Sequence, residues 1–198
     1  MELLVQQLVN GLAVGSIYAL IALGYTMVYG TIKLINFAHG DVYMMGAFVG
    51  YFAVMVLKMN VFLALLVAMV VCAVLGVGIE RVAYKPLRKS TRVAALITAI
   101  GVSYLLENAM SYFFGAESRP FPSDFGTETF TLFGDVSVNG KQILIFGFTV
   151  ALMALLQFIV RYTKMGKAMR AVAVDEQAAQ LMGIDVDGVI SFTFALGS

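Results

Sequence analysis

The chain has 198 residues, of which 61% are hydrophobic and 13% charged, and its mean hydropathy is +0.90. A soluble domain typically carries about 25% charged and about 45–50% apolar residues, and a water-facing surface could not hold this excess of apolar side chains. The formal net charge of +1 gives no electrostatic footprint for nucleic-acid phosphates. Composition therefore excludes an ordinary soluble enzyme, a disordered chain and a nucleic-acid binder, and it indicates an integral protein of a lipid bilayer.

Stretches with few or no charged residues predict the membrane spans. We expect spans near residues 8–29, 42–57, 59–79, 93–115 and 142–160, with a sixth starting at Val189. Because a crossing helix needs about 20 apolar residues, the second span is short, broken or extended by its polar flank. The sixth run reaches about half a span at Ser198, so we expect a chain that is incomplete at its C-terminus. The predicted fold is all-α: a single polytopic transmembrane helix bundle over residues 1–198.

Lysine and arginine predict the orientation of this bundle, because short cytoplasmic loops are rich in them. The loop between the third and fourth spans carries five such cations, and residues 161–170 carry four, whereas residues 116–141 hold two cations against four carboxylates. The first two segments are therefore expected in the cytoplasm and the third outside. The alternation in Thr127–Phe133 and the Asn139-Gly140 pair predict a small external hairpin. The N-terminus lies outside if 42–57 crosses, and in the cytoplasm if that segment is re-entrant.

Residues that could carry bond chemistry are few. His39 is the one histidine, so a two-histidine zinc site is excluded and we expect no metal site. The Met165-Gly166-Lys167-Ala168 segment lacks the hydroxyl residue and the upstream glycine of a phosphate-binding loop. We therefore expect no catalytic residue and no cofactor in this chain.

The most unusual polar run is Lys33–Asp41, which places Asn36, His39 and Asp41 between the first span and the short second one. Polar groups at membrane depth are tolerated where they line a cavity or pair with one another, so this run is a candidate gate or translocation element. The alternative is an interfacial loop in which Asp41 caps a helix and His39 meets lipid headgroups.

Glu107 is the one charged residue within 93–115, and on a helix it shares a face with Ser103 and Ser111. A carboxylate inside the membrane costs a few kcal/mol unless it faces protein or water. Glu107 is thus a second candidate for the translocation path, and the alternative is a position near the outer end from which it reaches the interface.

Residues 161–188 form a predicted cytoplasmic coupling loop. Asp175 or Glu176 can begin a short helix, Ala178 and Ala179 give it a small-residue face, and Gly183 can end it. Such a helix suits docking into a groove of a partner, and the alternative is a connecting helix that lies on the membrane. Two glycine pairs with spacing four, Gly11/Gly15 and Gly46/Gly50, predict close helix packing.

Two of these regions resemble a known family. Gly15-Ser16-Ile17-Tyr18-Ala19-Leu20-Ile21-Ala22-Leu23-Gly24, followed by Ile35-Asn36-Phe37-Ala38-His39-Gly40-Asp41, is similar to the permease subunit of branched-chain amino acid ABC importers. Gln177-Ala178-Ala179-Gln180-Leu181-Met182-Gly183 is similar to the Glu-Ala-Ala-x-x-x-Gly coupling motif of importer permeases, with Gln177 where the general motif has glutamate. The resemblance spans essentially the whole chain.

This resemblance implies a multi-pass permease of a bacterial-type inner membrane that imports leucine, isoleucine or valine by alternating access. It implies separate ATP-binding cassette subunits that hydrolyse ATP, a second related permease, an extracytoplasmic substrate-binding protein and further spans beyond Ser198. The gate candidates are then Asn36, His39, Asp41 and Glu107. The coupling helix candidates are Gln177, Ala178, Ala179 and Gly183.

Two other classes of protein remain as alternatives. An ion-coupled secondary transporter would use Asp41 and Glu107 as proton or sodium sites, but such proteins often show internal repeats and the sequence has no clear one. A membrane-embedded enzyme would use His39 and Asp41 as an acid–base pair, but no nucleophile accompanies them.

Overall fold

The computed structural model describes residues 2–88, 90–115, 117, 119–121, 129–133 and 136–198. The prediction of an all-α bundle is confirmed, with one small hairpin beside it. In chain order the elements are α1 (Glu2–Ile32), α2 (His39–Met55), α3 (Val61–Ile79), the π-helical turn η1 (Glu80–Tyr84), the 3₁₀ turn η2 (Lys85–Leu87), α4 (Arg92–Phe114), β1 (Thr129–Phe133), β2 (Val136–Asn139), α5 (Gly140–Tyr162), α6 (Lys164–Val174), α7 (Glu176–Leu181) and α8 (Val186–Gly197).

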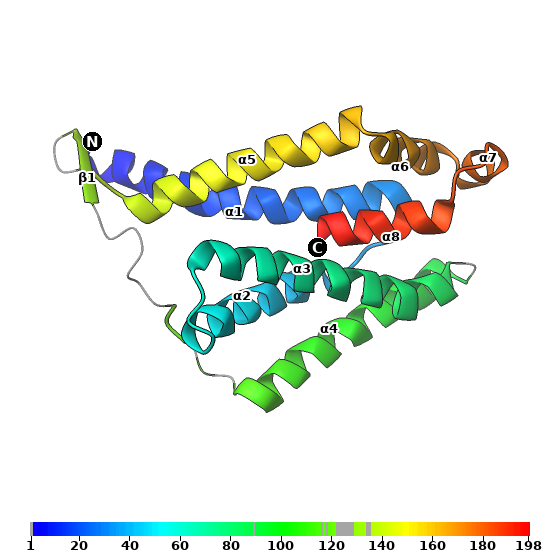
Figure 1. Ribbon diagram of the computed structural model, residues 1–198, viewed down its shortest axis with the longest axis horizontal. Helices are drawn as coiled ribbons and strands as arrows, with labels where there is room; N and C mark the ends of the chain where they lie inside the picture. Colours follow the sequence, from blue (N-terminus) through cyan, green and yellow to red (C-terminus); the bar gives the residue numbers. More distant parts are fainter. Residues whose placement is uncertain (1, 89, 116, 118, 122–128, 134–135) are drawn as a thin grey trace.

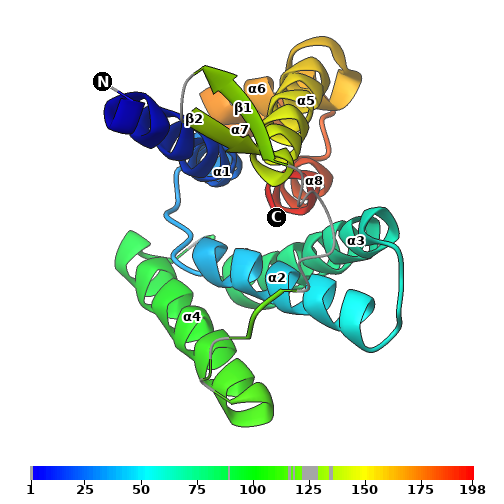
Figure 2. The ribbon, with the colours of Figure 1, turned by 90° about the vertical axis from the view of Figure 1, so that its left-hand side faces the viewer.

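The long helices form two layers, with α1 and α5 in one and α2, α3 and α4 in the other (Figures 1 and 2). The N-terminus and the β1–β2 hairpin lie at one end of the molecule, which we call the hairpin end (Figure 1). The turn η2, the start of α4, and helices α6 and α7 lie at the other, which we call the basic end (Figure 1). Helix α8 runs from the basic end into the space between the layers and packs against both α1 and α3.

Four helical stretches in the described part of the chain are long and apolar enough to cross a membrane: Leu3–Ile32, Val61–Leu87, Val93–Phe114 and Gly140–Tyr162. Few of their residues are buried within the chain, and most of their apolar side chains are exposed or half-buried, as expected where lipid rather than protein covers them. Helix α2 is shorter, with 17 residues. These helices make the chain a multi-pass membrane protein.

Polar residues placed just before the apolar runs begin several of the helices. The Asn60 side chain accepts a hydrogen bond from the Phe62 N–H at 3.1 Å, and the Thr91 hydroxyl accepts one from the Ala94 N–H at 3.3 Å. Asp185 begins α8 in the same way, accepting from the Gly188 N–H at 3.2 Å. Each cap satisfies a backbone donor that the first turn of a helix leaves without a partner, and so fixes where the apolar segment begins.

Helix α8 approaches its neighbours closely because glycines face it. A Cβ atom on Gly24 of α1 would lie 2.5 Å from the Gly197 carbonyl, and one on Gly76 of α3 would lie 3.0 Å from the Phe194 carbonyl. The predicted pair Gly11/Gly15 makes no such approach, since a Cβ there would meet nothing within 4 Å among the described atoms. Gly46 does pack closely, with its Cβ position 2.9 Å from Cys72 Sγ. A Cβ on Gly50 would meet nothing within 4 Å among the described atoms, so of the four predicted glycines only Gly46 makes a close approach.

The hairpin at one end of the bundle is antiparallel and pairs Thr129 with Asn139 and Phe130 with Val138. The expected alternation begins at Thr127 and Glu128, which lie outside the described residues. The expectation that Asn139-Gly140 forms its turn is wrong, because Asn139 ends β2 and Gly140 begins α5. The Asn139 N–H instead bonds to the Gln142 side chain at 3.2 Å, as in a helix cap.

Candidate functional site

The segment between α1 and α2 is held in an ordered turn by the Asn36 side chain. Helix α1 ends as Lys33 takes a positive φ of 55°. Asn36 Oδ1 then accepts hydrogen bonds from the Ala38 N–H at 3.1 Å and from the Tyr84 hydroxyl at 3.0 Å. The first bond is the local turn that asparagine favours, and the second fixes the segment to η1, 48 residues further along the chain.

His39 begins α2 and is buried against α1. Its Nε2 lies 3.1 Å from the Ile21 carbonyl oxygen, and its ring meets the Tyr25 ring edge-on with centroids 5.9 Å apart. Because Ile21 belongs to α1 and His39 to α2, this contact between the imidazole and the carbonyl links the two helices. Its contacts are thus with protein.

Asp41 lies in the first turn of α2, where a negative charge is favoured by the helix dipole. Its side chain is 8% exposed, and Oδ2 has no hydrogen-bond partner among the described residues. Ala38 rather than Asp41 occupies the N-cap position. A buried carboxylate oxygen without a partner is costly, so Asp41 is the polar group of this segment that most requires a further partner.

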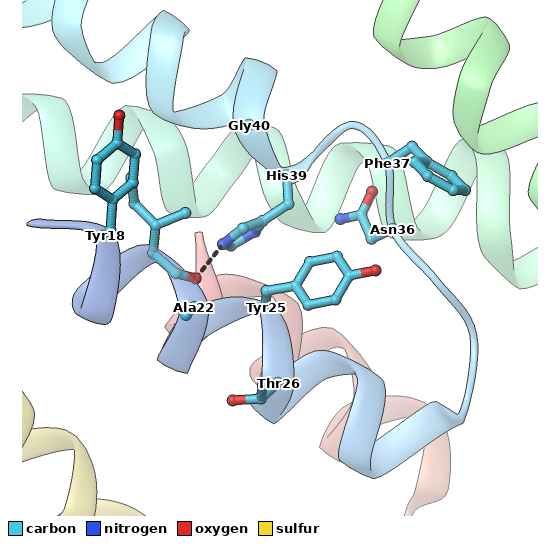
Figure 3. A pocket seen from close by; sticks show the side chains of 9 residues that line it. Tyr18, Ala22, Tyr25, Thr26, Asn36, Phe37, His39 and Gly40 are labelled. Atoms are coloured by element: carbon cyan, nitrogen blue, oxygen red, sulfur yellow. Dashed lines mark hydrogen bonds between the residues drawn. The ribbon is translucent and has the colours of Figure 1, made fainter. Parts of the chain in front are cut away.

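A cavity of about 470 Å³ opens beside this segment (Figure 3). Its walls come from α1, the α1–α2 turn and the start of α2, and they are mostly apolar; the lining residues are Tyr18, Ile21, Ala22, Tyr25, Thr26, Asn36, Phe37, His39 and Gly40. Small-ligand sites typically have volumes of about 300–1,000 Å³ and mostly apolar walls with a few polar groups. The volume of this open hollow falls within that range, and its mostly apolar lining includes the polar side chains of Asn36 and His39.

Asn36, His39 and Asp41 share one turn, but their side chains reach different partners: η1, α1 and, for one Asp41 oxygen, none among the described atoms. Asn36 and His39 line the cavity together (Figure 3). Glu107 lies apart from this group, exposed on α4, whose packing is mainly against α2 and η1.

The predicted coupling segment contains the short helix α7, with an N-cap and a C-terminal motif as expected from its sequence. Asp175 caps it by accepting a hydrogen bond from the Ala178 N–H at 3.0 Å. Gly183 has a φ of +83°, the Gly183 N–H bonds to the Gln180 carbonyl and the Ile184 N–H bonds to the Ala179 carbonyl. This pair of bonds is the Schellman motif, in which glycine relieves the strain of a left-handed residue.

The two faces of α7 differ from each other in exposure. Ala179 is buried in the hydrophobic core, whereas Gln177 and Ala178 are exposed, and Leu181 and Met182 are 89% and 83% exposed. Ala179 therefore fixes α7 to the rest of the chain and is not on its outer face. The exposed surface of α7 and the residue after it includes a glutamine, an alanine and two large apolar side chains.

Known proteins that resemble this chain identify its family. A family model described as the permease component of a branched-chain amino acid transport system matches residues 7–198. The chain belongs to this family. It is 43% identical to the high-affinity branched-chain amino acid transport system permease BraD of Pseudomonas aeruginosa and 42% identical to LivH of Escherichia coli, in both cases over 98% of this chain. No solved structure matches it.

The chain spans 66% of the length of these two curated relatives. A more distant relative, a probable branched-chain amino acid transport permease LivH of Methanocaldococcus jannaschii, is 30% identical over 91% of this chain. These relatives are thus named as branched-chain amino acid transport permeases. Family membership and the four membrane-span candidates make this chain a multi-pass protein of the inner membrane.

Two residues that follow α3, Glu80 and Tyr84, were not among the site residues predicted from the sequence. Glu80 and Tyr84 are among the most deeply buried side chains of the permease, and Tyr84 holds Asn36. One signal was available: Glu80 directly follows the 21 uncharged residues of 59–79, and a carboxylate so close to an apolar stretch needs a partner. Its partners, however, lie 8 and 111 residues away and no spacing rule connects them.

Proposed function

We propose that this chain is the membrane-spanning permease subunit of an ATP-driven importer of branched-chain amino acids. The observation that carries the proposal is the match of residues 7–198 to the permease family. The largely apolar cavity beside His39 supports it, because an aliphatic amino acid needs an apolar path with a few polar groups for its charged ends.

The proposed mechanism is alternating access without bond chemistry in this chain. ATP is bound and hydrolysed by separate cassette subunits that dock on the exposed face of α7, at the basic end. A second, related permease completes the pore, and a soluble binding protein delivers leucine, isoleucine or valine at the hairpin end. Asn36, His39 and Asp41 belong to the gate in this scheme, while Glu107 remains a candidate for the translocation path.

The test is uptake of radiolabelled leucine into proteoliposomes that contain the full-length permease with its cassette subunits, its second permease and the binding protein. We expect uptake to require ATP on the cassette side and to survive collapse of the sodium and proton gradients. Uptake that follows an ion gradient and ignores ATP would contradict the proposal and favour an ion-coupled transporter.

A substitution in the cavity wall gives a second test of the same proposal. Phe37 lines the cavity and is 48% exposed, so a leucine there keeps an apolar wall while changing its shape. Competition by isoleucine, valine and a polar amino acid in the uptake assay then shows whether the wall selects for apolar side chains.

A further inference from the structure

A buried ion-pair network joins the end of α3 to the start of α8. Glu80 is 0% exposed, and its Oε1 accepts from the Arg88 guanidinium while its Oε2 accepts from the Ser191 hydroxyl at 2.7 Å. Arg88 also donates to Asp187 at 2.5 Å. Two residues of α8, Asp187 and Ser191, are therefore tied to the segment that follows α3.

The outer part of this network is a surface ion pair. Lys85 Nζ lies 2.7 Å from Asp187 Oδ2, and both side chains are about half exposed, at 49% and 53%. Asp187 precedes the apolar run of α8, and the hydrogen bond from Lys85 is the largest of the effects that hold the pKa of its carboxyl below the usual value. An exposed pair of this kind contributes little to stability, so Glu80 and Arg88 form the part of the network that is shielded from water.

The segment between these ionic groups is a π-helical turn, η1. The Lys85 N–H bonds to the Glu80 carbonyl, five residues back rather than four. Within this turn Glu80, Ala83 and Tyr84 are all buried. π-helical turns are rare, and single turns of this kind are frequently found at functional sites.

Tyr84 in the same turn contacts two other elements. Its ring packs on Phe194 of α8 with centroids 5.4 Å apart. Its hydroxyl donates to Asn36 Oδ1 at 3.0 Å, the shorter of two contacts with this turn, the other being the Ile35 carbonyl at 3.4 Å. Asn36 Oδ1 also holds the Ala38 N–H, next to His39. One side chain therefore touches both α8 and the turn that carries the gate candidates.

Helix α8 in turn follows directly after α7. Residues 182–185 connect the two helices, and the Ile184 N–H bonds back to the Ala179 carbonyl of α7. A force applied to α7 therefore reaches α8 within a few residues, and the network above connects α8 to η1.

We propose that η1 is the transmission element of this permease: Glu80 and Arg88 hold η1 to α8, and the Tyr84 hydroxyl passes the movement of α8 to Asn36 and the turn before His39. The inference rests on the proposed function, since it describes how ATP-driven movement of α7 changes the gate. Tyr84 and Glu80 are positioning residues in this mechanism, because they act through Asn36 and α8. A buried ion pair suits this role, as its best-attested use is to specify one arrangement rather than to add stability.

The decisive variant is Tyr84→Phe, which removes the hydroxyl and keeps the ring against Phe194. In proteoliposomes with the complete transporter, leucine uptake and ATP hydrolysis are measured together. We expect ATP hydrolysis to stay close to the wild-type rate while leucine imported per ATP falls about fivefold, the loss that corresponds to one net hydrogen bond. An unchanged ratio of leucine to ATP overturns the inference.

Tyr162→Phe is the matched control, because it removes the hydroxyl of an exposed tyrosine at the end of α5, at the same end of the molecule. Its ratio of leucine to ATP should equal that of the wild type. For the ionic part, Glu80→Gln should lower the ratio and Lys85→Gln, in the exposed pair, should not. Removing one partner of a buried pair also weakens folding, so Tyr84→Phe alone decides the outcome if Glu80→Gln does not assemble.

A double-mutant cycle with Asn36→Ala shows whether both side chains act through one bond. If they do, adding Tyr84→Phe to Asn36→Ala produces no further fall in the ratio of leucine to ATP. Two independent, multiplying effects would overturn the proposed path through Asn36. Failure of the proposed function is seen separately, as a wild-type transporter that takes up no leucine with ATP.

Discussion

At the hairpin end, a side-chain amide of α1 makes hydrogen bonds to the backbone of β2 that a neighbouring strand would otherwise make. The Gln6 side chain of α1 accepts a hydrogen bond from the Ser137 N–H at 2.9 Å and donates one to the Ser137 carbonyl at 2.9 Å. It thus pairs with β2 as a neighbouring strand would. Asn10 Oδ1 accepts from Gln6 at 3.2 Å and from Gln142 at 2.9 Å, so one amide cluster ties α1, β2 and α5 together.

The substitution Gln6→Leu tests this anchor. It removes both bonds to Ser137, each worth a net of about 0.5–1.5 kcal/mol, so the amide of Ser137 should exchange with solvent deuterium roughly tenfold or more faster. Hydrogen exchange read by mass spectrometry on the purified permease measures this. Gln7→Leu is the control, because Gln7 is the exposed neighbour on α1 and the same change there should leave exchange in β2 as it was. Equal protection in both variants would show that Gln6 does not hold the hairpin.

For single residues, the sequence predicts a structural role where the hydrogen-bond partner is only a few residues away. Asn36 bonds to Ala38, two residues away, and the run Lys33–Asp41 was recognisable as unusual from its polar residues alone. Gln6 and Tyr84 find their partners 131 and 48 residues away. Gln6 lies just before the first predicted span and Tyr84 in the basic loop after the third, and no local pattern at either position predicts these distant partners.

For helix α7, the sequence predicts where the helix begins and ends but not which of its faces is buried. Asp175 and Gly183 act as expected, because capping depends on residues within one turn of the helix end. Which alanine faces inward depends on what α7 packs against, and Ala179 rather than Ala178 is buried. A bulky residue at Ala179 would therefore disturb packing within the permease, and it would not be a clean test of docking.

Gly183 offers a cleaner test of the α7–α8 connection. With a φ of +83°, it adopts a conformation that costs a β-branched residue at least about 1–2 kcal/mol. Gly183→Val should displace the end of α7 and reduce the amount of cassette subunit that co-purifies with the permease. Gly183→Asn should retain the partner, because asparagine tolerates left-handed conformations.

The result that counts against this prediction is equal loss in both variants. In that case the small size of Gly183, and not its backbone conformation, would matter at the contact with the partner. A Cβ atom at Gly183 meets nothing within 4 Å of this chain among the described atoms, so crowding within the permease itself is not a competing cause.

At the scale of the whole molecule, charge distinguishes the two ends. The basic end holds Arg81 of η1, Lys85 of η2 and the cations of residues 161–170, and the N-terminus lies with the hairpin at the other end (Figure 1). The positive-inside rule then places the basic end in the cytoplasm. The sequence leaves one point of this topology open, because the 16 residues of the predicted span 42–57 would extend only about 24 Å as a helix, less than the hydrocarbon core of about 30 Å. Helix α2, with 17 residues, is similarly short.

The direction of α2 allows that point to be tested. Helix α2 runs toward the hairpin end, so the turn with Leu57, which is 65% exposed, should lie on the same side of the membrane as Lys141 at the start of α5 (Figure 1). We introduce one cysteine at a time in a Cys72→Ser background, as Leu57→Cys, Lys141→Cys and Ser90→Cys. A membrane-impermeant maleimide added to intact spheroplasts should label the first two, and Ser90→Cys only after the membrane is opened. If Leu57→Cys instead behaves like Ser90→Cys, α2 is re-entrant and returns to the basic side. If Ser90→Cys alone is labelled in closed spheroplasts, the assigned orientation is wrong for the whole chain, and α7 does not lie in the cytoplasm.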